Sequence, residues 1–116
     1  MLREVLISKL HRAKVTDTNI NYSGSITIDK KLMDKVGIVE HEKVHVWDID
    51  NGVRVITYAI PGKNGEITMN GGAARLIKKG DRIIITTFGL FTEKELKNQK
   101  PKIAILDEHN KVIEWK

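Results

Sequence analysis

The dipeptide Gly24-Ser25 is the part of the sequence whose residue types permit unusual chemistry. A serine hydroxyl can attack the carbonyl carbon of the preceding residue and shift the acyl group from nitrogen to oxygen. A glycine before the serine leaves that approach free of a side chain. β-Elimination from the resulting ester would leave a dehydroalanine, and its hydrolysis would leave a pyruvoyl group at a new N-terminus. The alternative interpretation is an inert Gly-Ser turn.

Most other catalytic motifs are absent from the sequence. There is no Walker loop, no GxGxxG motif entering a helix and no HExxH motif, and Ser25 is not part of a GxSxG motif. His41 and His45 are four residues apart, with Asp48 and Asp50 nearby. Because these residues fall in a predicted turn and strand rather than on one helix face, we expect no metal site.

The composition predicts one mainly β domain over residues 1–116. Aromatic residues make up only 5% of the chain, so the core must be aliphatic, and the abundant valine and isoleucine favour strands. The sequence has no cysteine, which suits a reducing compartment, and no apolar run near the ~20 residues of a membrane span. We therefore expect a cytoplasmic protein without membrane contact.

Strand signals surround Gly24-Ser25. A first strand with a bend is predicted over 5–15, and a short strand over 25–28 follows the dipeptide directly. Asp29 is expected to cap a short helix that ends at Gly37. The serine is therefore expected at the entrance to a strand.

The rest of the chain alternates between strand and turn signals. Asn51-Gly52 predicts a two-residue type I′ hairpin turn. Further strands are expected over 67–69, 81–91 and in a closing hairpin, and a short helix carrying Leu76 and Ile77 before Gly80. Because so many short strands would leave open edges, we predict a small closed β-barrel with two or three short helices.

Four stretches resemble the pyruvoyl-dependent aspartate 1-decarboxylases, in that family's order and spacing. They are SKLHRAKVT (8–16), NYSGSITID (21–29), GIVEHEKVHVWDIDNGVRVITYAI (37–60) and NGGAARLIKKGDRIII (70–85). The resemblance implies a double-psi β-barrel and a homotetramer with sites between subunits. It also implies conversion of L-aspartate to β-alanine and CO₂ for pantothenate biosynthesis, and maturation that can need a helper protein.

The same resemblance implies self-cleavage between Gly24 and Ser25 into a β-chain (1–24) and an α-chain (25–116). The cofactor would be a covalent pyruvoyl group derived from Ser25, with neither metal nor PLP. It would form a Schiff base with the amine of aspartate. Tyr58 corresponds to the family's proton donor, and Thr57 to a residue that assists cleavage and contacts substrate.

The remaining implied site residues bind or surround the substrate. Arg54 and Lys9 match the basic residues that bind its carboxylates. The substrate loop and the residues that line the site correspond to Gly71, Gly72, Ala73, His11, Tyr22 and Asn70. The family loop commonly reads Asn-Gly-Ala-Ala-Ala, so Gly72 is a departure that keeps the N–H donor and loosens the loop.

Strand geometry sets one constraint on this site. Alternation places Arg54 and Tyr58 on one face of a strand, about 13 Å apart, and Thr57 on the other. All three side chains cannot line one pocket on a flat, regular strand. A bulge, a strong barrel twist or a contribution from two subunits would resolve this, and a site between subunits is the simplest of the three.

Two other functions stay open at this point. The net charge of +5 permits a small basic barrel that binds nucleic acid, although no basic stretch with aromatic side chains offers stacking platforms. A purely structural or assembly protein is the third possibility.

Overall fold

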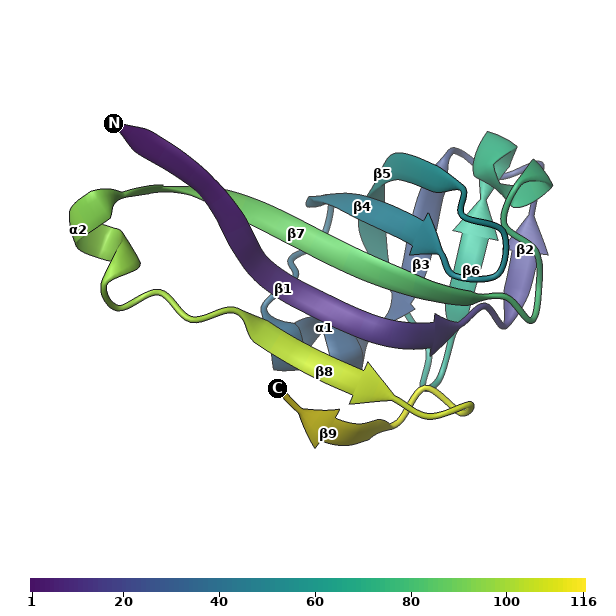
Figure 1. Cartoon of the computed structure of the whole chain (residues 1–116). Helices are drawn as coiled ribbons and strands as arrows, with labels where there is room; N and C mark the ends of the chain where they lie inside the picture. The colour runs from purple at the N-terminus through teal and green to yellow at the C-terminus, as the bar shows by residue number, and fades with distance from the viewer.

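Nine strands, two short α-helices and one 3-10 helix make up the computed structural model, which describes all residues 1–116 (Figure 1). The strands are β1 (Leu2–Lys14), β2 (Asp17–Asn19), β3 (Ser25–Asp29), β4 (Lys43–Asp48), β5 (Arg54–Gly62), β6 (Ile67–Asn70), β7 (Arg82–Thr92), β8 (Lys102–Leu106) and β9 (Val112–Trp115). The helices are α1 (Lys30–Val36), η1 (Gly71–Arg75) and α2 (Glu93–Leu96). None of the helices is long and apolar enough to cross a membrane.

The strands pair in the order β2-β6-β3-β5-β4-β7-β1-β8-β9. Three of the pairs are parallel, namely β1 with β8, β2 with β6 and β3 with β5, and the others are antiparallel. These parallel pairs join strands that are distant in the sequence, as a double-psi arrangement requires. The prediction of a mainly β fold is confirmed, and the topology is consistent with a double-psi β-barrel.

The core is aliphatic, as the composition predicts. It contains 19 buried residues, among them Leu10, Ile26 and Ile85, and none of them is aromatic. Burying such side chains stabilises the fold by roughly 1.5–3 kcal/mol each. This packing fixes β3, which begins with Ser25, between its partner strands β5 and β6.

The long ribbon formed by β1 and β7 carries the predicted bend. Its register shifts between Leu6 and Ser8 and again between His11 and Ala13, and Arg12 has a φ of 67°. Such shifts are β-bulges, which turn a strand and redirect its side chains. In Figure 1 the outer part of this ribbon extends away from the body toward α2, with the N-terminus at its end.

The caps of α1 are confirmed. The Asp29 carboxylate accepts a hydrogen bond from the Lys31 backbone N–H at 2.8 Å, and Gly37 ends the helix with a φ of 80°. A cap of this kind satisfies N–H groups that have no partner within the helix.

The predicted type I′ turn at Asn51-Gly52 is wrong. Only Gly52 has a positive φ, whereas a type I′ turn needs two such residues. The connection is longer: the Asp48 N–H donates to the Val53 carbonyl, and the Asp48 carboxylate accepts from the N–H groups of Asp50 and Asn51. The aspartate side chain therefore organises a wider loop between β4 and β5.

Three further elements differ from the sequence-based expectation. The helix after Asn70 is a short 3-10 helix that ends at Arg75, so Leu76 and Ile77 lie beyond it. The strand β2 and the helix α2 were not predicted. β2 has three residues that pair in parallel with β6, and α2 is held by a capping box between Thr92 and Glu95.

Candidate functional site

Ser25 is the first residue of β3 and is almost completely buried. It pairs with Asn70 on β6 and is 1% exposed. Its hydroxyl donates to the Ser23 carbonyl at 3.0 Å and accepts from Nδ2 of Asn70 at 3.0 Å. Gly24, directly before it, is exposed. The Ser25 hydroxyl, which makes two hydrogen bonds, therefore lies next to the Gly24–Ser25 peptide bond, and the Gly24 side of that bond is exposed to solvent.

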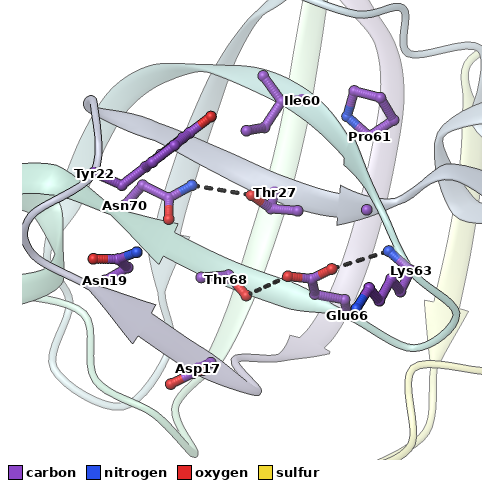
Figure 2. Close-up of a pocket in the computed structure, with 11 residues that line it drawn as sticks. Asp17, Asn19, Tyr22, Thr27, Ile60, Pro61, Lys63, Glu66, Thr68 and Asn70 are labelled. Atoms are coloured by element: carbon purple, nitrogen blue, oxygen red, sulfur yellow. Dashed lines mark hydrogen bonds between the residues drawn. The ribbon is translucent and has the colours of Figure 1, made fainter.

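Asn70 connects Ser25 to a second hydroxyl. Its Nδ2 also donates to Oγ1 of Thr27 at 3.0 Å, an interaction that Figure 2 shows directly. Although Asn70 directly precedes η1, its side chain makes no cap hydrogen bond to that helix. Thr27, which the sequence analysis missed, lies on the same face of β3 as Ser25, and the two-residue period of a strand could have identified it.

Gly71 makes the close backbone approach in this region. Its φ is +74°, and a Cβ on it would lie 2.7 Å from Cα and 2.9 Å from N of Gly24. A Cβ on Gly24 itself would meet nothing within 4 Å. The segment that contains the candidate cleavage bond therefore rests against the start of η1, and only glycine fits at position 71.

A polar hollow of about 480 Å³ lies beside this network. Tyr22, Thr27 and Asn70 line one part of it, and Lys63 and Glu66 another (Figure 2). Tyr22 is 53% exposed, so this part of the hollow is accessible to solvent in the single chain.

Thr57 and Tyr58 lie on β5, the strand that pairs with β3 next to Ser25. Ala59 pairs with Ile26 in parallel register, so Tyr58 is one step before that pair, at the level of Ser25. The Tyr58 ring meets the His41 ring edge to face at 5.9 Å. Thr57 is half-buried, and its hydroxyl makes no hydrogen bond within the chain.

Arg54 lies in a separate hollow of about 410 Å³. Its guanidinium stacks over the Trp47 ring, 4.8 Å from the ring centroid, and His45 and Phe88 line the same hollow. The guanidinium has no carboxylate partner within the chain. A planar cation held against an aromatic ring with free N–H groups suits an incoming carboxylate.

Lys9 and His11 line a third hollow, together with Arg12 and Lys116. Burial lowers the pKa of His11, and the positive charges of Lys9, Arg12 and Lys116 lower it further. Nδ1 of His11 is buried without a hydrogen-bond partner. The three cationic side chains around His11 make this hollow a second region that favours an anion.

The structure brings some of the predicted site residues together and keeps others apart. Ser25, Asn70, Gly71 and Tyr22 surround one region, with Tyr58 at its edge, and Gly72 and Ala73 follow on η1. The hollows of Arg54 and of Lys9 share no lining residue with the hollow beside Asn70. The single chain therefore does not assemble a complete site for a dicarboxylate.

Comparison with known proteins identifies the family. The family model described as aspartate decarboxylase matches residues 1–113. The chain belongs to the aspartate decarboxylase family. A curated aspartate 1-decarboxylase of Bacillus cereus (strain B4264) is 53% identical over 116 residues, which cover 98% of this chain and 91% of that relative. An aspartate 1-decarboxylase of Bacillus thuringiensis (strain Al Hakam) is 51% identical with the same coverage.

Proposed function

We propose that this chain is an aspartate 1-decarboxylase that converts L-aspartate to β-alanine and CO₂ for pantothenate biosynthesis in the cytoplasm. The observation that carries the proposal is 53% identity, over 98% of the chain, to proteins named for this activity. The buried Ser25 hydroxyl beside an open glycine supports it independently.

The chain prepares its own reactive group in this proposal. Oγ of Ser25 attacks the Gly24 carbonyl carbon, the Gly24–Ser25 C–N bond breaks, and the hydroxyl proton ends on the freed nitrogen. Loss of the Cα proton then expels the Gly24 carboxylate, which leaves chain 1–24 and a dehydroalanine at the start of chain 25–116. Water hydrolyses that residue, releases ammonia and leaves a pyruvoyl group.

The residues around position 25 fit such a group. The Asn70 amide, an N–H donor that is buried and points at residue 25, suits a carbonyl oxygen there. When bound, the pyruvoyl group supplies an electron-accepting carbonyl for decarboxylation, which no side chain in the site provides. The protein's own tasks are to bind both carboxylates, to orient the bond that breaks and to deliver one proton.

Arg54 and Lys9 bind the substrate carboxylates in this proposal. Arg54 can bind one carboxylate in a bidentate manner, because its guanidinium stacks on the Trp47 ring and has no ion-pair partner in the chain. Both residues lie in hollows separate from Asn70. A neighbouring subunit would therefore have to complete each site, which supports the homotetramer with sites between subunits.

Tyr58 and Thr57 have separate roles. The Tyr58 phenol, at the level of Ser25 on the adjacent strand, protonates the carbon from which CO₂ has left. The Thr57 hydroxyl, which has no partner in the chain, donates to the oxyanion of the acyl shift.

The loop from Gly71 to Ala73 contributes backbone N–H donors toward the substrate, with His11 and Tyr22 lining the site. Gly71 also holds the cleavage segment in place through its contact with Gly24. A maturation helper protein would bind this exposed segment and orient the Gly24 carbonyl for attack by Oγ of Ser25.

Mass spectrometry of the purified chain tests the proposal. The wild-type protein should resolve into fragments 1–24 and 25–116, and Ser25→Ala should remain intact and form no β-alanine. Ser23→Ala is the matched control, because the acceptor for the Ser25 hydroxyl is the Ser23 backbone carbonyl, which the substitution keeps. Full decarboxylase activity in Ser25→Ala would contradict the proposal.

A further inference from the structure

Three carboxylates gather at a point that the proposed reaction does not use. Asp48 ends β4, Asp50 lies in the following loop, and Asp81 directly precedes β7. The pairing of Asp48 with Ile83 and a hydrogen bond from the Ile49 N–H to the Arg82 carbonyl bring these segments together. One oxygen from each aspartate lies within 4.8 Å of the other two.

The Asp48 carboxylate has one oxygen that is buried and unused. The side chain is 3% exposed, and Oδ1 accepts from the N–H groups of Asp50 and Asn51. Oδ2 accepts from no backbone N–H and from no basic or neutral side chain, and the hydrogen-bonding side chain next to Asp48 is the Asp81 carboxyl. Such a group is costly to bury, since an unsatisfied charged acceptor loses its hydration without compensation.

No positive side chain neutralises the cluster. None of the five ion pairs in the structure involves Asp48, Asp50 or Asp81. The nearby Arg82 guanidinium instead donates to the carbonyls of Arg12 and Asp107. Three acidic groups therefore lie together without a counter-charge in a protein whose net charge is +5.

Asp48 is the buried member of the cluster. Burial, chiefly, together with the hydrogen bond and charge of the adjacent Asp81 carboxyl, raises the pKa of the Asp48 carboxyl to about 6. A bound cation would remove this conflict, because it favours the ionised form of every carboxylate that it contacts.

We propose that Asp48, Asp50 and Asp81 form a binding site for a divalent cation of the calcium class. Carboxylate oxygens are ligands for hard cations, and Ca²⁺ binds them at about 2.3–2.6 Å, so two ligands on one ion can be up to about 5 Å apart. Ligands of Mg²⁺ at about 2.0–2.1 Å can be at most about 4.2 Å apart. The three oxygens lie within 4.8 Å of one another, which is inside the limit for ligands of one Ca²⁺, and the exposed Asp50 leaves room for water ligands.

The site would fix the loop that leads into β5. Asn51, in the same loop, already donates from Nδ2 to the Leu76 carbonyl at 2.9 Å. A cation would add a second link between the β4–β5 loop and the segment that joins η1 to β7. This inference does not rest on the decarboxylase proposal, and its test needs no activity measurement.

Calorimetric titration of the full-length chain, freed of metal with EDTA, tests the site with CaCl₂ and then with MgCl₂. We expect one Ca²⁺ per chain, weaker binding of Mg²⁺, and a melting temperature that rises with Ca²⁺ concentration. Asp50→Asn should weaken Ca²⁺ binding by about tenfold or more, because it removes a charge but keeps an acceptor for the Arg82 N–H. Asp81→Asn repeats the test and likewise keeps an acceptor for the Lys78 N–H.

Asp34→Asn is the control, since this exposed aspartate pairs with Lys30 on α1 and is no part of the cluster. It should bind Ca²⁺ as the wild type does. Absence of binding heat and of a melting shift up to about 10 mM Ca²⁺, above the roughly 1 mM dissociation constant of weak calcium modules, would overturn the proposal. Equal affinity in wild type, Asp50→Asn and Asp81→Asn would overturn it as well.

Discussion

Replacing Gly71 with alanine should block self-cleavage without touching Ser25. Gly71 has a φ of +74°, and its absent Cβ would lie 2.7 Å from the Gly24 Cα. The substitution therefore combines backbone strain with a steric clash against the residue that supplies the attacked carbonyl.

The two effects can be estimated separately. An L-residue in the left-handed region costs about 1–2 kcal/mol. Carbon atoms in ordinary contact are about 3.5–4.0 Å apart, so a separation of 2.7 Å requires Gly24 and residue 71 to move apart by roughly 1 Å. A displacement of about 1 Å at a reacting group can slow a reaction by roughly 100-fold.

Gly37→Ala is the matched control for strain. Gly37 has a φ of +80°, and a Cβ on it would meet nothing within 4 Å. Urea unfolding should show a similar strain cost in both variants and about 1–3 kcal/mol of additional loss in Gly71→Ala from overpacking. Mass spectrometry over time should show cleavage at the wild-type rate in Gly37→Ala and roughly 100-fold slower cleavage in Gly71→Ala.

The reasoning would be refuted if Gly71→Ala, folded by the same unfolding assay, cleaved as fast as Gly37→Ala. In that case the contact between Gly71 and Gly24 would have no part in positioning the cleavage bond.

Three other variants and conditions test neighbouring parts of the account. Gly72→Ala should stabilise the chain by about 0.4–1 kcal/mol in urea unfolding and leave cleavage unchanged. The reason is that a Cβ at position 72 would meet nothing within 4 Å and that the φ of Gly72 is not positive. A destabilised variant would show that the loop needs glycine at this position. Tyr58→Phe should cleave normally yet form β-alanine much more slowly in an assay of product, because the phenol is proposed to act only in turnover. Normal turnover in this variant would mean that another group donates the proton. Burial lowers the pKa of His11 below 6.5 in the folded state, so as pH falls the unfolded chain binds the proton before the folded chain does. The free energy of unfolding should therefore be highest above pH 6.5 and should decrease as pH falls toward the lowered pKa. Urea unfolding of the wild type against His11→Gln between pH 7.5 and 5 measures this, and parallel pH profiles of the two proteins would contradict it.

Local signals predicted the parts of the fold that depend on neighbouring residues. The cap at Asp29, the stop at Gly37 and the strand from Ser25 follow from short-range hydrogen bonding and alternation, and the structure has all three. The Asn51-Gly52 turn failed although its signal is local. The buried Asp48 carboxylate binds the loop N–H groups and imposes a wider connection.

Features that depend on distant pairing could not be read from the sequence. The three residues of β2 form a strand only because β6 offers a parallel partner. Asn70 stands where a helix cap could be expected, yet its side-chain amide donates hydrogen bonds to Ser25 and Thr27. These residues come close to Asn70 only when β3 pairs with β6. The cluster of Asp48, Asp50 and Asp81 likewise depends on the pairing of β4 with β7.

The sequence named candidate site residues, whose roles stay predictions, but it did not indicate how they are arranged. The stretches that resemble the family supplied the names of the residues, and the family match supports the activity. Strand geometry already implied that Arg54, Thr57 and Tyr58 could not all line one pocket of a regular strand, and the structure places the Arg54 guanidinium over the Trp47 ring.

Trapping with borohydride tests the central claim most directly. Matured protein is treated with borohydride in the presence and absence of aspartate, and the mass of fragment 25–116 is measured. The account predicts that the amine of aspartate, or of the β-alanine left after CO₂ is lost, becomes attached at residue 25 and that activity is lost in proportion. A fully cleaved, active protein whose fragment 25–116 gained neither adduct would contradict it.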